Sequence, residues 1–349
     1  MKNLPNLNPL RFVLSVFVLI YHLPLISKTL NIPYYNDSPV FRKGILAVYY
    51  FFTLSGFLIL RLIYSELKKT NKFNFNNFYQ RRIRRLYPVY YLVLFTGLTL
   101  YHFILPQIGI SYNRSYSITE LVLNYVFFIP NVFRYNHPNT GSILIILWSI
   151  GIEEQFYLFI PVFMYFFRKK IVISVLILLI ILLLALLLLP SFYVYSNFYF
   201  YFLFGGLLSI LSLDKKIALL NNKFLHVLIY ALFILSFTTN LFTFQNLFIF
   251  HMFNLIISGL LILLLSSYPV FIIKNRIINH FGKISYGIYM YNMIAITSVL
   301  YVISKIKPYN YLNHKIFIIV LNLIVIFLTI AVAHCSYKYF ESRFYKSRY

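Results

Sequence analysis

The sequence predicts an all-α, polytopic membrane protein with about ten transmembrane helices and both termini in the cytoplasm. Three observations predict this class. First, 61% of the 349 residues are hydrophobic and only 11% are charged. Second, apolar runs of about 20 residues recur along the chain, which is the length that a helix needs to cross the hydrocarbon core of a membrane. Third, the basic residues gather in alternate loops between these runs, as is typical of cytoplasmic loops.

The apolar runs divide the chain into ten expected spans. They lie near residues 10–30, 44–63, 86–106, 143–167, 171–190, 196–213, 224–241, 247–266, 281–303 and 316–338. We see no internal repeat and no low-complexity linker between them. We therefore expect residues 1–349 to form a single integral-membrane domain without an appended soluble domain. The N-terminus lacks a small-residue cleavage site, so we do not interpret it as a cleaved signal peptide.

The loop charges predict the orientation. The second, fourth, sixth and eighth loops and the tail are basic through Lys68, Lys69, Lys72, Arg81, Arg82, Arg84, Arg85, Arg168, Lys169, Lys170, Lys215, Lys216, Lys223, Lys274, Arg276, Arg343, Lys346 and Arg348. Loops 191–195 and 242–246 contain no lysine or arginine. Because cytoplasmic loops are enriched in these residues, both termini are expected to face the cytoplasm. The ninth loop, with Lys305, Lys307 and Lys315, weakens this pattern without reversing it.

The stretch from Ile118 to Phe133 is apolar but short. It contains Pro130 and is flanked by Arg114 and Arg134. If it crossed the membrane, every later loop would change sides and the basic loops would face outward. We therefore predict an interfacial or re-entrant segment on the outer side.

The net charge of +24 arises from 31 basic and 7 acidic residues. In a soluble protein such a balance would indicate a nucleic-acid partner. Here the basic residues lie in short loops between apolar runs, so we expect no nucleic acid and expect membrane lipids as the surroundings. The single Cys335 excludes an internal disulfide and a cysteine-based metal site.

The first span carries two ionisable residues, Arg11 and His22, in an otherwise apolar run. Eleven residues at about 100° each make about 1100°, so both side chains share one face and lie about 16 Å apart along the axis. An ionisable residue at membrane depth is costly and by default marks a functional site. The alternative is that Arg11 is an interfacial anchor and His22 is a core histidine whose hydrogen bonds are satisfied.

Two further motifs lie in the second span and before the third. Residues 51–57 read Phe-Phe-Thr-Leu-Ser-Gly-Phe. Small residues in membrane helices usually serve close packing, and the alternative places Ser55 in a mid-depth polar site.

The segment 78–88 holds four arginines in five residues. They serve either as a topology anchor or as a site for a phosphate-rich cytoplasmic ligand, because the guanidinium fork binds phosphate in a bidentate manner.

The segment 147–157 reads Leu-Trp-Ser-Ile-Gly-Ile-Glu-Glu-Gln-Phe-Tyr. Two carboxylates inside a predicted span are costly, and neighbours lie about 100° apart on a helix. We therefore expect one of Glu153 and Glu154 to face a polar cavity and the other to face a salt-bridge or hydrogen-bond partner.

The segment 282–292 opens the ninth span and ends at Asn292. It is rich in small residues and tyrosines, which again suit close packing.

Depth relates these motifs to one another. His22, Ser55, Glu154 and Asn292 fall at similar depth in their own spans. At about 1.5 Å per residue, all four are expected near the membrane midplane. A polar site at that depth, with arginines at the cytoplasmic mouth, indicates a reaction or a passage across the membrane.

Together these motifs resemble the acyltransferase-3 family of integral-membrane O-acyltransferases, which modify cell-surface carbohydrates. The matching elements are Arg11-x10-His22, Phe51–Phe57, Arg81-Arg82-x-x-Arg85-Leu86-Tyr87-Pro88 and Trp148–Tyr157. They follow the family's order along nearly the whole chain. Two positions depart from the family pattern, because Tyr49 stands where an acidic residue is common and Asn292 stands where histidine is frequent.

The resemblance implies ten helices with both termini inside, in the inner (plasma) membrane of the cell. It implies an acyl-CoA donor, most often acetyl-CoA, that binds from the cytoplasm. The implied acceptor is a hydroxyl of a surface glycan or lipid-linked sugar, such as O-antigen, capsule or peptidoglycan. No metal and no permanently bound cofactor are expected, and the oligomeric state stays open.

The resemblance also implies roles for individual residues. His22 is the expected catalytic base, and Glu154 or Glu153 would orient its imidazole. A covalent acyl-histidine is an alternative route. The donor-binding residues are Arg11, which would align the pantetheine arm, and Arg81, Arg82 and Arg85, which would hold the CoA phosphates. The supporting polar residues are Ser55, Trp148, Glu153 and Asn292.

Two other classes of protein fit some of these features. A transporter of a lipid-linked sugar or an anionic polymer would also have midplane polar residues and cationic mouths. Such a transporter would be expected to have Gly/Pro-broken helices in matching halves, which we do not find. A structural subunit of a surface-polymer synthase is the third possibility.

Overall fold

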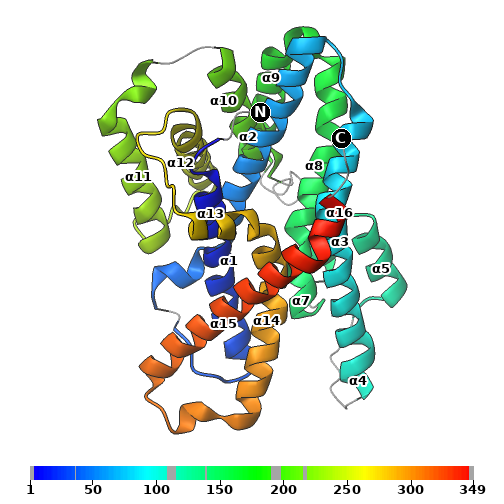
Figure 1. Ribbon diagram of the computed structural model, residues 1–349, viewed down its shortest axis with the longest axis vertical. Helices are drawn as coiled ribbons and strands as arrows, with labels where there is room; N and C mark the ends of the chain where they lie inside the picture. The colour runs from blue at the N-terminus through cyan, green and yellow to red at the C-terminus, as the bar shows by residue number, and fades with distance from the viewer. Residues whose placement is uncertain are drawn as a thin grey trace. The chain divides into compact units, whose positions relative to one another are not determined.

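The computed structural model describes residues 4–35, 37–107, 115–137, 140–189, 198–214 and 218–345. Within these ranges the chain is helical and contains no strand (Figure 1), which confirms the predicted all-α class. Six parts of the topology prediction lie outside the described residues, namely Arg114, loop 191–195, Lys215, Lys216, Lys346 and Arg348.

Most of the chain is in long helices. These are α1 (Leu7–Thr29), α2 (Gly44–Thr70), α3 (Phe75–Thr99), α8 (Leu147–Phe166), α9 (Ile171–Leu188), α10 (Tyr199–Asp214), α11 (Lys223–Thr238), α12 (Leu247–Ser267), α14 (Ser285–Ile306) and α15 (His314–Ser336). The short α-helices are α4 (Leu105–Gln107), α5 (Ile118–Val126), α6 (Pro130–Asn136), α7 (Ser142–Ile145), α13 (Arg276–Lys283) and α16 (Ser342–Tyr345). Two π-helical turns, Leu100–Ile104 and Tyr337–Glu341, continue α3 and α15.

Among the described residues, eight helical segments are long and apolar enough to cross a membrane. They are Leu7–Thr29, Gly44–Thr70, Phe75–Gln107, Ser142–Phe166, Arg168–Leu188, Leu247–Ser267, Ser285–Ile306 and His314–Tyr345. The predicted spans 196–213 and 224–241 correspond to α10 and α11, which have 16 residues each. Such helices are about 24 Å long, against a hydrocarbon core of about 30 Å. The chain is thus a multi-pass helical protein, and the total of ten spans stays a prediction.

Two predicted boundaries differ from the structure. The arginine motif was expected before the third span, but α3 already begins at Phe75 and includes it. The Asn74 side chain begins this helix by accepting a hydrogen bond from the amide of Asn77. The predicted span 281–303 is divided, because α13 ends at Lys283 and α14 begins at Ser285. Hydropathy marks where a chain leaves apolar surroundings, whereas helical hydrogen bonds continue until a cap ends them.

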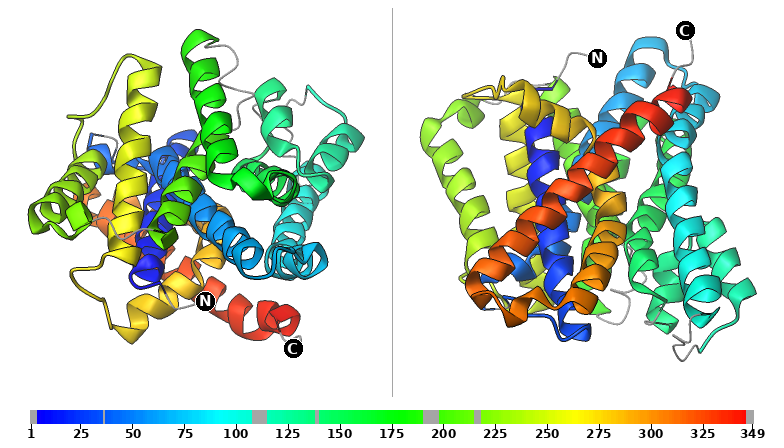
Figure 2. Two further views of the ribbon diagram at one scale, coloured as in Figure 1. Left: turned by 90° about the horizontal axis from the view of Figure 1, so that it is seen from above. Right: turned by 60° about the horizontal axis from the view of Figure 1, so that its bottom comes forward.

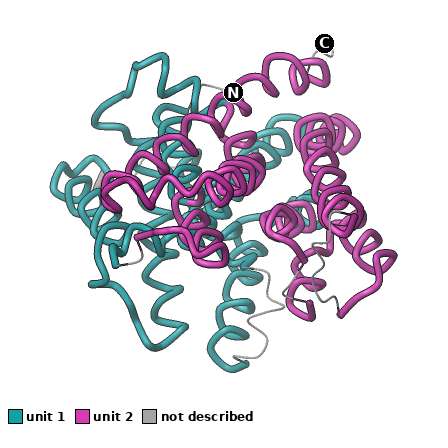
Figure 3. Tube along the Cα trace, turned by 90° about the horizontal axis from the view of Figure 1, so that it is seen from below, with its two compact units in different colours: residues 1–17, 37–73, 156–283 teal, residues 18–36, 74–155, 284–349 magenta. Residues whose placement is uncertain are grey.

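The helices form two compact units (Figure 3). Unit 1 comprises residues 1–17, 37–73 and 156–283, and unit 2 comprises residues 18–36, 74–155 and 284–349. Each unit therefore draws on separate parts of the sequence, and both α1 and α8 contribute residues to each of them.

In unit 1, α2 and α10 pack with their backbones close together. A Cβ atom on Gly56 would lie 1.9 Å from the carbonyl oxygen of Phe202, and one on Gly205 would lie 2.1 Å from that of Thr53. The Thr53 hydroxyl also hydrogen bonds to the hydroxyl of Ser258 in α12, at 3.0 Å. Gly56 in the segment 51–57 therefore serves the close packing that small residues permit in membrane helices.

We expect Gly56→Ala to destabilise the protein on the order of 2 kcal/mol or more, because the new methyl group meets backbone rather than a movable side chain. Gly287→Ala is the matched control, since a Cβ there would be 3.2 Å from its nearest neighbour. Thermal unfolding of the purified protein in detergent measures both. Equal midpoints for the two variants would contradict the packing assignment.

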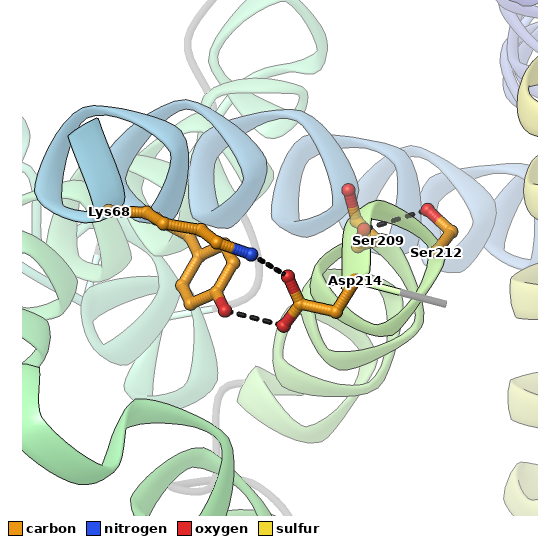
Figure 4. Close-up of polar contacts among 5 residues, drawn as sticks. Lys68, Ser209, Ser212 and Asp214 are labelled. Carbon is orange, nitrogen blue, oxygen red and sulfur yellow. Dashed lines mark hydrogen bonds and ion pairs between the residues drawn. The ribbon is translucent and has the colours of Figure 1, made fainter. Parts of the chain in front are cut away.

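A polar cluster joins the end of α10 to α2 (Figure 4). Asp214 accepts hydrogen bonds from the hydroxyl of Tyr64 and from the ammonium group of Lys68. Two residues before Asp214, the Ser212 hydroxyl donates to the Ser209 carbonyl at 2.7 Å. The side chain of Lys68 is 58% exposed, so its ion pair contributes at most about 1 kcal/mol. The cluster therefore adds little to the stability of the protein.

In unit 2, α14 and α15 lie side by side (Figure 2). The hydroxyl of Tyr291 in α14 hydrogen bonds to that of Ser336 in α15, at 2.8 Å. The Tyr286 hydroxyl donates to the carbonyl of Leu86 in α3, at 2.9 Å. These bonds satisfy tyrosine hydroxyls inside the unit and fix α14 between α3 and α15.

The segment 118–133 forms two short helices, α5 and α6, with a break between them. Phe128, in the break, has a φ of 59°, a conformation that bulky residues rarely adopt. Its ring packs on Tyr87 and Tyr90 of α3, at centroid distances of 4.8 and 4.6 Å. The two helices have 9 and 7 residues, and neither is long enough to cross a membrane. This agrees with the prediction that the segment does not span.

Candidate functional site

The arginine motif occupies the first half of α3. Arg81 is exposed, whereas Arg82 and Arg85 are half-buried. The guanidinium carbon of Arg82 lies 6.0 Å from the centre of the Phe78 ring. Side chains three and four residues apart are neighbours on a helix, so Arg81 and Arg82 both border Arg85. Arg81 and Arg85 form no ion pair within the described residues, although the charge of Arg85 acts on the buried carboxyl group of Glu341.

Glu154, on α8, is only 3% exposed. Its carboxylate accepts a hydrogen bond from the hydroxyl of Tyr87, and the positive charge of Arg82 acts on it. The second carboxylate oxygen, Oε1, has no hydrogen-bond partner among the described residues. A buried carboxylate oxygen without a partner lowers the stability of the fold. Glu154 thereby connects α8 to the arginine motif of α3.

His22 is half-buried on α1, beside the ring of Tyr21 at a centroid distance of 5.2 Å. The imidazole has a backbone hydrogen-bond partner in Val18, whereas its Nδ1 atom has none among the described residues. The positive charge of Arg134 on α6 acts on the rings of both His22 and Tyr21. The structure forms no hydrogen bond and no ion pair between His22 and Glu154, within the residues it describes. Which of Glu154 and Glu153 orients the imidazole of His22 stays a prediction.

The physical reason why His22 and Glu154 do not bond is the direction of their side chains. Equal depth in two spans brings residues to one level of a membrane, but it does not determine where around its helix each side chain points. Glu154 points toward Tyr87 and Arg82, on the side of the arginine motif. Glu153 is half-buried, and its charge acts on Tyr289. Both charges also act on Tyr286 of α14, so the two carboxylates share that neighbour although they lie about 100° apart on α8.

Asn292 and Trp148 complete the predicted residues of unit 2. Asn292 is fully buried, and its amide nitrogen donates to the Tyr289 carbonyl at 2.8 Å. Its Oδ1 atom has no hydrogen-bond partner among the described residues. The ring of Trp148 lies 5.8 Å from the guanidinium carbon of Arg134, within the range of a cation–π interaction.

Arg11 and Ser55 lie in unit 1, and both are half-buried.

Tyr49, at the position where the family commonly has an acid, is buried in unit 1 as well. Its ring stacks on Tyr201 at 5.0 Å, and the Tyr201 hydroxyl hydrogen bonds to Nδ1 of His251 at 3.0 Å. An aromatic cluster with one imidazole thus surrounds this position, which explains how an uncharged residue is accommodated there.

Two residues at these sites were missed as candidates from the sequence. His251 stands in the apolar run of α12, and its signal was an ionisable side chain inside a predicted span. Arg134 was noted only as the flank of a short apolar stretch. Its position in the sequence could have marked it as a candidate. A short segment on one side of the membrane can bring a cation close to residues of neighbouring spans.

The fold and the site define a class of protein, a multi-pass helical membrane protein with a histidine, a buried carboxylate and a group of arginines in one unit. The sequence model of the acyltransferase-3 family, described as an acyltransferase domain, matches residues 4–337. The chain therefore belongs to this family of acyltransferases. This confirms the resemblance that the motifs indicated.

Two curated relatives align with about half of the chain. The peptidoglycan O-acetyltransferase OatA of Listeria monocytogenes is 32% identical over 170 residues, which are 48% of this chain and 25% of that protein. The O-acetyltransferase OatA of Staphylococcus aureus (strain NCTC 8325 / PS 47) is 31% identical over 166 residues, which are 47% of this chain and 25% of that protein. The match thus spans a quarter of the length of these relatives. No solved structure matches the chain.

Proposed function

We propose that this chain is a membrane O-acyltransferase that moves an acyl group, in the first instance acetyl, from cytoplasmic acyl-CoA to a carbohydrate hydroxyl outside the cytoplasm. The family membership supports acyl transfer. The names of the relatives support acetyl as the group and peptidoglycan as the class of acceptor. The eight apolar segments support a place in a membrane, which we propose is the plasma membrane. The observation that carries the proposal is His22, a half-buried imidazole whose Nδ1 is unengaged by the described residues.

In the proposed reaction, His22 takes the proton of the acceptor hydroxyl. The hydroxyl oxygen attacks the thioester carbonyl and forms the new C–O bond. The C–S bond then breaks, and the CoA thiolate recovers the proton from the imidazolium. A neutral imidazole suits this role because its free ring nitrogen can accept a proton.

The donor would be held by the arginine motif of α3. Arg81, Arg82 and Arg85 would bind the CoA phosphates, and the flexible pantetheine arm would carry the thioester toward His22. Glu154 bonds to Tyr87 and is acted on by Arg82, so we place it on the donor side, where it would position Arg82.

Transfer is tested with the purified chain in liposomes, labelled acetyl-CoA and a soluble peptidoglycan fragment. The expected product is an O-acetyl ester on the fragment, identified by mass and by its loss in alkali. Hydrolysis of acetyl-CoA without an ester on the glycan would contradict transfer to carbohydrate.

We expect Arg81→Gln and Arg85→Gln each to raise the KM for acetyl-CoA about 10-fold or more, because a charge-assisted hydrogen bond contributes about 1.5–3 kcal/mol. The kcat should change little if these arginines bind the donor equally strongly in the ground and transition states. Arg168→Gln is the matched control, because Arg168 is an exposed arginine outside the motif. Steady-state kinetics with varied acetyl-CoA measure the effect. An unchanged KM in both motif variants would contradict the donor site.

A further inference from the structure

One face of α8 holds the short helix α6 in place. Gly151 and Gln155 follow Trp148 by three and by seven residues, so all three share one face of α8. The Gln155 amide donates to the Phe128 carbonyl at 2.6 Å and to Asn131 Oδ1 at 2.8 Å. The absent side chain of Gly151 leaves room for Pro130, whose ring would lie 2.6 Å from a Cβ there. These three residues belong to the motif 147–157, and neither Gly151 nor Gln155 contributes to the donor site or to the base.

The chain before α6 is fixed as well. The hydroxyl of Tyr90 donates to the Tyr125 carbonyl at 2.7 Å, and that of Tyr91 donates to the Val126 carbonyl at 3.1 Å. These carbonyls stand at the end of α5, where intrahelical donors are lacking. The turn into α6 is therefore held from both α3 and α8, so the position of α6 is well determined within unit 2.

This arrangement places Arg134 close enough to His22 for its charge to act on the imidazole. Arg134 is half-buried on α6 and lies over the Trp148 ring at 5.8 Å. Its charge acts on Tyr21, His22 and Tyr289. Within the described residues Arg134 forms no ion pair. Glu120, the acidic residue of α5, instead lies 3.3 Å from His137.

A half-buried guanidinium without a carboxylate partner is suited to an anion that forms during a reaction. Attack on a thioester carbonyl shifts the electron pair of the C=O bond onto oxygen, and donors aimed at that oxygen contribute strongly to catalysis. A cation–π contact with the Trp148 ring holds the guanidinium group near the indole without neutralising its charge. The anchored helix α6 supplies the preorganisation that such a donor needs.

We propose that Arg134 is a catalytic residue that stabilises the oxyanion of the acyl group while His22 takes the proton of the acceptor hydroxyl. This inference rests on the proposed function. The oxyanion forms when the hydroxyl oxygen bonds to the carbonyl carbon, and it disappears when the C–S bond breaks and thiolate leaves. Trp148, Gly151 and Gln155 are positioning residues, because they act through α6.

The kinetic test compares Arg134→Gln, Arg134→Lys and the control Arg168→Gln in the liposome assay. We expect Arg134→Gln to lower kcat about 100-fold or more, as removal of one oxyanion donor does elsewhere. The KM for acetyl-CoA should stay within about 2-fold, because the interaction is made in the transition state. Arg134→Lys should restore part of the rate, which a purely structural role would not predict. A kcat within about 2-fold of wild type in Arg134→Gln would overturn the proposal while leaving the proposed function intact.

A binding test does not depend on turnover. Trp148 is the only tryptophan in the chain, so its fluorescence reports on Arg134 directly. Titration with methylphosphonate, a small tetrahedral anion, should change the emission of the wild-type protein and of Arg168→Gln. In Arg134→Gln the dissociation constant should rise about 10-fold or more, since a charge-assisted hydrogen bond is removed. If wild type shows no response, or if both variants bind equally, the anion site is refuted, and this holds even if the chain fails to transfer acetyl groups. Thermal midpoints close to wild type show that each variant is folded.

Discussion

Replacing His22 with glutamine is expected to lower kcat for acetyl transfer by a factor on the order of 100 to 10,000, which is the range that general acid–base catalysis contributes. Glutamine keeps a polar side chain of similar length, but it cannot accept the proton of the attacking hydroxyl. The KM for acetyl-CoA should change little, because the arginine motif that would bind the phosphates is on another helix. Steady-state kinetics of the purified protein in liposomes measure both quantities.

The matched control is His334→Gln. His334 is also on a long apolar helix, α15, but its side chain is exposed. We expect this variant to retain the wild-type rate. If His22→Gln folds, inserts into liposomes and transfers acetyl groups at the wild-type rate, His22 is not the base. A small residual rate would agree with catalysis by the remaining groups alone.

Glu154→Gln is expected to produce the second large effect, and it distinguishes two roles. If Glu154 positions Arg82, the change should chiefly raise the KM for acetyl-CoA, by a factor of about 10 to 100, because a misplaced Arg82 would bind the donor phosphates less strongly. If it instead orients His22 during the reaction, kcat should fall while KM stays the same. The interactions of Glu154 with Tyr87 and Arg82 predict the first outcome.

A double variant makes this test sharper. Arg82→Gln alone should raise the same KM, and Glu154→Gln added to it should have little further effect, since residues that act as one unit are not additive. Glu66→Gln, a change of another half-buried glutamate, serves as the control. A fall in kcat with an unchanged KM would show that Glu154 acts at the imidazole, through a contact that this structure does not form.

Much of the fold could be predicted because the length and hydropathy of each apolar run can be read from neighbouring residues alone. Apolar runs of about 20 residues have few alternatives to a helix in a membrane, since every backbone group must be bonded internally. The short stretch 118–133 was also interpretable, because Pro130 and its length argue against a span. The ends of α3 and α14 could not be located in this way, because they depend on caps and packing rather than on hydropathy.

The site was only partly predictable, for a geometric reason. Sequence spacing gives depth along a helix, and depth placed His22 and Glu154 at one level. It does not give the direction in which another helix presents its side chains, and Glu154 bonds to Tyr87 instead. The position of Arg134 in a short segment could mark it as a candidate, but its place beside Trp148 could not be predicted, since it depends on the turn at Phe128 and on the hydrogen bonds of Gln155.

The central claim is transfer across a membrane with His22 as the base. It is tested most directly in sealed vesicles whose cytoplasmic face is outward, with labelled acetyl-CoA outside and a peptidoglycan fragment enclosed. The account predicts alkali-labile label on the enclosed glycan with the wild-type protein, and a rate lower by about 100-fold or more with His22→Gln. Label that reaches only acceptors on the donor side, or that reaches the enclosed glycan equally well with His22→Gln, would contradict it.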